Sequence, residues 1–152
     1  MPVLHGEDLR QAFSAATSCL ERFRDTINAL NVFPVPDGDT GTNMLLTMRS
    51  AMEKLAPAPG RTAGEAADIL AEGAFWGARG NSGVILSQFF KGFAEVLHGR
   101  EVCNGADLAQ GFSRASDAAY SSVGQPVEGS SDNITGESFA NKQFVSGATT
   151  AL

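Results

Sequence analysis

The chain has 152 residues, with 17 acidic and 11 basic side chains, a formal charge of −6 and a pI near 4.8. Such a length typically gives one domain with a sizeable core, and the acidic balance argues against general nucleic-acid binding, which depends on clustered Lys and Arg. No apolar run approaches the roughly 20 residues that span a bilayer, and the N-terminal residues lack the features of a signal peptide. We therefore expect a cytoplasmic protein with no membrane span and no nucleic-acid partner, in which Cys19 and Cys103 are reduced.

The first predicted element is a long amphipathic helix, because apolar residues recur at steps of three and four up to residue 30. This stripe, expected to face inward, consists of Leu9, Phe13, Ala16, Leu20, Phe23, Ile27 and Leu30. Pro34 and Pro36 disfavour helical conformation in the residues before them, so the helix should end near Asn31.

Four further helical segments are predicted, and no alternating strand pattern appears before residue 122. They cover about residues 40–55, 63 through 70 as far as the break that begins at Gly77, 84–97 and 107–121, and the second of these opens with a capping box of Thr62 and Glu65. Their expected inward residues include Leu45, Met48, Met52, Leu55, Ile85, Phe89, Phe93, Leu97, Leu108, Phe112, Ala115 and Ala119. The pattern predicts an all-α bundle with its loops gathered at one end.

Composition changes after Gly129, where the chain becomes rich in Ser, Thr, Asn and Gly. We therefore expect one helical domain over residues 1–129 and an atypical, foreign and poorly ordered tail over residues 130–152.

The segment 31–43 reads NVFPVPDGDTGTN and concentrates oxygen-bearing side chains before the second helix. Asp37 and Asp39 are two residues apart, so both carboxylates can face one cation cluster, and ligands of this kind suit Mg²⁺. A solvated Asp-Gly turn followed by a helix cap is the alternative. An EF-hand starting at Asp37 is excluded, because its twelfth position is Met48 instead of Glu.

Two glycine-containing segments precede predicted helices, where free backbone N–H groups and the helix dipole favour a phosphate. The candidate phosphate-binding residues are Thr40, Gly41, Thr42 and Asn43, and Gly80, Asn81, Ser82 and Gly83. Arg79 adjoins the second segment and can offset phosphate charge, although a plain surface arginine is an equal alternative. Glycine turns with Ser or Thr caps explain each segment separately, and neither a P-loop nor a GxGxxG motif is present.

Three further residues are assigned structural roles. His5 and His98 lie outside both glycine-containing segments, and His98 is interpreted as a helix-end residue. Trp76 is expected in the core, with a place beside a nucleotide base as the alternative.

The two motifs NVFPVPDGDTGTNM and GARGNSGVILSQ together resemble the N-terminal nucleotide-binding domain of the bacterial fatty acid kinase A subunit, a relative of the dihydroxyacetone kinase L subunit. The resemblance covers about residues 5–129. It implies an antiparallel eight-helix barrel that binds ATP at one end through two Mg²⁺ ions. The implied metal ligands are Asp37 and Asp39, with Asn31 as a further ligand because dihydroxyacetone kinases carry an Asp near that position. Asp37, Asp39 and Arg79 are the implied catalytic residues, and segments 40–43 and 80–83 the phosphate-binding loops.

The implied reaction transfers the γ-phosphate of ATP to a fatty acid carboxylate, which a separate fatty-acid-binding protein subunit presents. Such a carboxylate is ionised at neutral pH and needs no general base. A dihydroxyacetone kinase-like glycerone phosphotransferase and a non-catalytic nucleotide-binding module remain alternatives, and a homodimer is a further option.

The chain departs from the family pattern after residue 129, so we expect a truncated, incomplete barrel. Its first and fifth helices should then expose apolar residues, including Phe13, Leu20, Phe112 and Tyr120.

Overall fold

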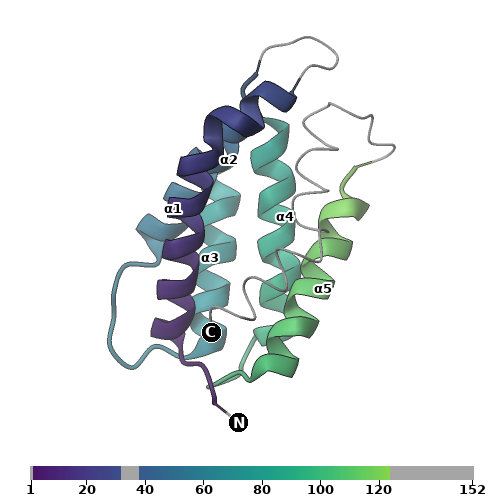
Figure 1. Cartoon of the computed structure of the whole chain (residues 1–152). Helices are drawn as coiled ribbons and strands as arrows, with labels where there is room; N and C mark the ends of the chain where they lie inside the picture. The colour runs from purple at the N-terminus through teal and green to yellow at the C-terminus, as the bar shows by residue number, and fades with distance from the viewer. Residues whose placement is uncertain (1, 32–37, 124–152) are drawn as a thin grey trace.

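The computed structural model describes residues 2–31 and 38–123, which form an all-α bundle of five helices. These are α1 (Gly6–Leu30), α2 (Thr40–Lys54), α3 (Ala63–Gly77), α4 (Gly80–Leu97) and α5 (Gly105–Ser121). Consecutive helices run in opposite directions (Figure 1), so α2 and α4 begin at one end, the upper end, and α1, α3 and α5 begin at the lower end. The all-α prediction is confirmed, but the loops alternate between the two ends. The predicted tail, 130–152, lies outside the described residues.

The helix boundaries follow from local sequence, with one informative exception. α1 ends at Leu30, as the prolines predict, and the Thr62–Glu65 capping box opens α3. α4 begins at Gly80, four residues earlier than predicted, so the segment 80–83 is the first helical turn instead of a loop. Glycine permits this start because its φ of +63° lies in the left-handed region that other residues avoid.

Five phenylalanines from α1, α4 and α5 form the centre of the core: Phe13, Phe89, Phe90, Phe93 and Phe112. The Phe13 ring meets Phe90 and Phe93 edge-on, with 5.5 Å between centroids in both pairs. The predicted inward residues of α4 and α5 are all buried. Phe13 and Phe112 are therefore not uncovered, which corrects the sequence-based expectation, because Phe93 of α4 packs against both rings.

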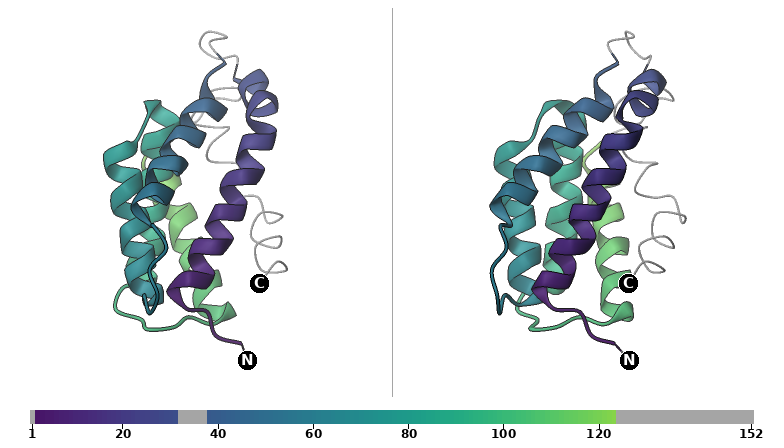
Figure 2. Two further views of the ribbon diagram at one scale, coloured as in Figure 1. Left: turned by 90° about the vertical axis from the view of Figure 1, so that its left-hand side faces the viewer. Right: turned by 60° about the vertical axis from the view of Figure 1, so that its left-hand side comes forward.

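The apolar stripe of α1 is buried only in its first half. Leu9 and Phe13 are buried, whereas Phe23 is 48% exposed and Leu30 is 57% exposed. α1 packs chiefly on α2 and α3, and it lies beside α2 in both views of Figure 2. The prediction of a fully inward stripe is thus wrong at Phe23 and Leu30. Leu20 is partly buried against the core and not uncovered as expected, whereas Tyr120 on α5 is exposed as expected.

Backbone hydrogen bonds connect the segments of the lower end. Leu4 and Cys103 exchange two bonds, of 2.7 and 3.0 Å, in an isolated antiparallel bridge. The N–H of Gly6 donates to Arg61 at 3.1 Å, and the N–H of Ala63 donates to Glu101 at 3.0 Å. These bonds join the N-terminal residues, the α2–α3 connection and the α4–α5 connection.

Two predictions from composition can be compared with the described residues. Cys19 and Cys103 are both free thiols. None of the described helices combines the length and apolar character that crossing a bilayer requires.

Candidate functional site

The two predicted phosphate-binding segments lie side by side at the upper end, where α2 and α4 begin (Figure 1). A Cβ atom built on Gly80 would lie only 2.5 Å from Nδ2 of Asn43. One on Gly83 would overlap Oγ1 of Thr47. Glycine at both positions therefore allows the two helix starts to approach this closely without displacing these side chains.

The first turn of α4 offers the clearer place for an anion. The first bond of this helix runs from the N–H of Gly83 to the carbonyl of Arg79, at 3.0 Å. The N–H groups of Gly80, Asn81 and Ser82 precede it and have no intrahelical acceptor. These N–H groups lie at the positive end of the α4 helix dipole, which favours a negative charge.

Ser82 in this turn is a buried polar residue that needs explanation. Its side chain is 1% exposed, and its Oγ has no hydrogen-bond partner within residues 2–31 and 38–123. A buried hydroxyl without a partner costs roughly 1–3 kcal/mol. A ligand with acceptor oxygens bound at the α4 start would satisfy it.

The first turn of α2 is more fully engaged by protein groups. The N–H of Thr42 donates to Oδ1 of Asn28 at 3.1 Å, and the N–H of Asn43 donates to the Asp39 carbonyl at 2.9 Å. A Cβ on Gly41 would lie 2.5 Å from the carbonyl oxygen of Arg24, so glycine here admits the backbone of α1. Glycine at position 41 therefore permits the close packing of α1 on the first turn of α2, and the predicted approach of a ligand to Gly41 stays a prediction.

The predicted metal ligands are described only in part. Asp39 is exposed at the N-cap position of α2, and its backbone N–H donates to Oδ1 of the buried Asn31 at 3.3 Å. Asp37 lies outside the described residues. Within the described part of the chain, no group of three His, Cys, Asp or Glu side chains is placed to hold a metal. The side chains of Asp39 and Asn31 carry oxygen ligands of the kind that hard cations such as Mg²⁺ prefer.

Arg79 is the basic residue beside this site. Its side chain is exposed and takes part in none of the ion pairs found among the described residues. Its backbone N–H donates to Oγ1 of Thr47 at 3.1 Å. The guanidinium is therefore available to an anion at the α4 start.

Trp76 is not a core residue, which corrects the prediction. It is 76% exposed and makes an edge contact with the exposed Phe75, with 5.1 Å between ring centroids. Apart from Leu70, the buried residues of α3 are alanines and glycines, and a Cβ on Gly73 would lie 2.8 Å from Cα of Ala51. α2 and α3 approach too closely for an indole to fit between them.

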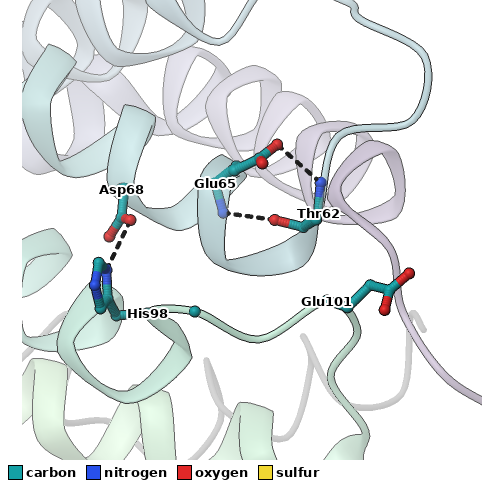
Figure 3. A pocket seen from close by; sticks show the side chains of 6 residues that line it. Thr62, Glu65, Asp68, His98 and Glu101 are labelled. Carbon is teal, nitrogen blue, oxygen red and sulfur yellow. Dashed lines mark hydrogen bonds and ion pairs between the residues drawn. The ribbon is translucent and has the colours of Figure 1, made fainter.

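A second polar region lies at the lower end, in a pocket of about 360 Å³. Nδ1 of His98 lies 2.9 Å from Oδ2 of Asp68 in a hydrogen bond, and Figure 3 shows this pair beside the reciprocal cap of Thr62 and Glu65. His98 is the C-cap of α4, as its interpretation as a helix-end residue predicted. The polar groups of this pocket thus serve helix ends, far from the two glycine-containing turns.

Asn28 is a residue of the upper end that the motifs did not reveal. Its amide group bonds to both the backbone and the side chain of Thr42. The only sequence signal was its position on the polar side of α1, three residues before Asn31.

The region that matches a known protein family includes both glycine-containing turns. The family model described as the DAK2 domain matches residues 34–131. An uncharacterized protein of Staphylococcus saprophyticus is 46% identical over 110 residues, and one of Staphylococcus aureus strain USA300 is 47% identical over 105 residues. These matches include 72% and 69% of this chain but 20% and 19% of the relatives, so the chain spans about a fifth of the length of the curated relatives it matches.

Proposed function

Because this chain belongs to the DAK2 domain family, we propose that it is the nucleotide-binding part of an ATP- and Mg²⁺-dependent phosphotransferase. The observation that carries the proposal is the convergence of two helix starts at the upper end. There Gly80 lies against Asn43, and the buried hydroxyl of Ser82 lacks a partner among the described residues. Two helix N-termini that meet in this way favour a polyphosphate.

The residues would divide the work between phosphate binding and charge neutralisation. The N–H groups of segment 80–82 and the Ser82 hydroxyl would hold phosphate oxygens, and Arg79 would offset their charge. Asp39, together with Asp37 and Asn31, would hold Mg²⁺. ATP supplies a γ-phosphoryl group, and its transfer depends mainly on such positioning and electrostatic stabilisation.

A fatty acid carboxylate, presented by a fatty-acid-binding partner subunit, is the acceptor that this site supports best. An ionised carboxylate has no proton to lose and so needs no general base, whereas a hydroxyl acceptor such as glycerone must lose a proton. The product would be an acyl phosphate.

Nucleotide binding is tested by calorimetry on the full chain with Mg²⁺ and a non-hydrolysable ATP analogue. We expect binding that requires Mg²⁺ and that weakens roughly tenfold or more in Asp39→Asn, because a charged metal ligand is lost. Asp117→Asn, an exposed change on α5, removes the same charge and should leave the affinity unchanged. Mg²⁺-independent affinity, or an equal effect of both variants, would refute the metal site.

Phosphoryl transfer is tested by measuring ADP release with a fatty-acid-loaded binding protein, with a glycerone-loaded partner and with neither. Turnover that requires the fatty-acid-loaded partner supports the proposed acceptor. Turnover with the glycerone-loaded partner would favour the dihydroxyacetone kinase-like alternative, and nucleotide binding without any turnover would favour a non-catalytic module.

A further inference from the structure

Asn28 of α1 reaches the first turn of α2 and makes two hydrogen bonds with one residue. Its Oδ1 accepts from the backbone N–H of Thr42 at 3.1 Å, and its Nδ2 donates to Oγ1 of Thr42 at 3.0 Å. Both residues are partly buried. Asn28 precedes the range matched by the family model, so its role does not follow from that match.

The orientation of the Asn28 amide is fixed by chemistry. A backbone N–H can only donate, so the side-chain atom facing it must be the carbonyl oxygen. The NH₂ group then faces the Thr42 hydroxyl, and Oγ1 must act there as an acceptor. The hydroxyl hydrogen of Thr42 is thereby directed away from Asn28.

Other threonine hydroxyls in the bundle use their hydrogen within their own helix. Thr17 donates to the carbonyl of Phe13, and Thr47 donates to that of Asn43, both at 2.8 Å. Thr42 makes no such bond with any described residue. Its hydroxyl hydrogen therefore remains available at the N-terminus of α2, where the helix dipole favours an anion.

We infer that Asn28 is a positioning residue that holds the Thr42 hydroxyl as a hydrogen-bond donor to a nucleotide phosphate. The inference rests on the proposed function, to which it adds Asn28 and the direction of the Thr42 hydroxyl hydrogen. Segment 80–82 and Thr42 would then donate to the phosphates from the starts of two different helices.

A double-mutant cycle in the full chain tests this assignment, with Mg²⁺ and a non-hydrolysable ATP analogue in calorimetry. In Asn28→Asp the carboxylate accepts from both the N–H and the hydroxyl of Thr42, so the hydroxyl hydrogen turns inward. We expect the affinity to fall roughly tenfold, as for a lost hydrogen bond to a charged group. Thr42→Val should have a similar effect, and the double variant should bind no more weakly than Thr42→Val alone.

A second measurement separates positioning from simple disruption of the helix start. Amide hydrogen exchange at Thr42 should stay slow in Asn28→Asp, because the bond from its N–H is kept. Asn104→Asp is the matched control, since Asn104 caps α5 at the lower end and aspartate caps equally well. This control adds the same charge and should leave nucleotide affinity unchanged.

The outcomes are distinguishable. A penalty for Asn28→Asp that persists in the Thr42→Val background would mean a charge effect and would overturn the assignment. Unchanged affinity in Asn28→Asp, or rapid exchange at Thr42 in that variant, would overturn it as well. If the unmodified chain binds no nucleotide, the proposed function fails, and the assignment falls with it.

Discussion

The backbone N–H of Arg79 donates to Oγ1 of Thr47 at 3.1 Å, and the same hydroxyl donates to the carbonyl of Asn43 at 2.8 Å. Thr47 is fully buried, so one side chain of α2 fixes the residue that precedes α4. This one hydroxyl therefore links the two proposed phosphate-binding turns directly, in addition to the close packing of Gly80 on Asn43.

Replacing this hydroxyl should lower stability measurably. Thr47→Val keeps the shape of the side chain but leaves the N–H of Arg79 without its acceptor, which should reduce the free energy of unfolding by about 1–3 kcal/mol. Urea denaturation measures this loss. Thr17→Val is the control, because among the described residues the Thr17 hydroxyl bonds only to its own helix, and Thr17 is partly exposed. Equal losses in the two variants would contradict the role assigned to Thr47.

Gly80 should be more sensitive to substitution than another glycine of the same backbone conformation. Gly80→Ala adds a Cβ within 2.5 Å of Asn43 at a φ of +63°, whereas Gly60→Ala has a φ of +77° and no atom within 4 Å of the new Cβ. The strain of positive φ, of order 1 kcal/mol, is common to both. Only Gly80→Ala should weaken nucleotide binding, which calorimetry would detect; equal affinities would argue against the tight approach of α2 and α4.

The two cysteines should differ strongly in reactivity. Burial raises the pKa of the Cys103 thiol to about 11, with a smaller contribution from the charge of Asp107, whereas Cys19 is exposed. At pH 8 a maleimide should modify Cys19 in the folded protein and Cys103 only after unfolding, which mass spectrometry of proteolytic peptides can follow. Comparable labelling of both in the native protein would contradict the buried position of Cys103.

The same shift in pKa predicts how stability depends on pH. In the unfolded chain the Cys103 thiol ionises near its ordinary value of 9.0, but in the folded protein it stays protonated to about 11. The unfolded state therefore binds fewer protons between these values, and the free energy of unfolding should fall as pH rises from about 9 to about 11. Cys103→Ala should reduce this part of the dependence. An unchanged slope in that variant would assign the loss to other groups.

The exposed half of the α1 stripe should contribute little to stability. Phe23→Ser removes a half-exposed ring and should cost less than about 1 kcal/mol, whereas Phe13→Ala empties a core position and should cost roughly 3–5 kcal/mol. Phe23→Ser combined with Leu30→Ser should also reduce binding of a dye that reports exposed apolar surface. A large loss of stability in Phe23→Ser would show that this ring is covered in solution.

Sequence reasoning succeeded where one local rule determines the outcome. The spacing of apolar residues and the capping residues predicted the five helices, and Pro34 and Pro36 predicted the end of α1. It failed where tertiary packing decides, because the exposure of Phe23 and Trp76 depends on which helices α1 and α3 contact. The motifs indicated both glycine-containing turns, but the link from Asn28 to Thr42 joins residues 14 positions apart and carries no recognisable spacing.

The two ends of the bundle differ in their main-chain bonds, although side-chain pairs such as His98–Asp68 are present at the lower end as well. Main-chain bonds such as the Leu4–Cys103 bridge close the lower end, whereas side chains of Asn28, Asn31 and Thr47 join the segments of the upper end. Main-chain bonds survive most amino-acid replacements, but each side-chain link can be lost by one. The lower end can therefore stay constant while single mutations alter the geometry of the upper end, so that evolution could retune ligand affinity there without rebuilding the scaffold.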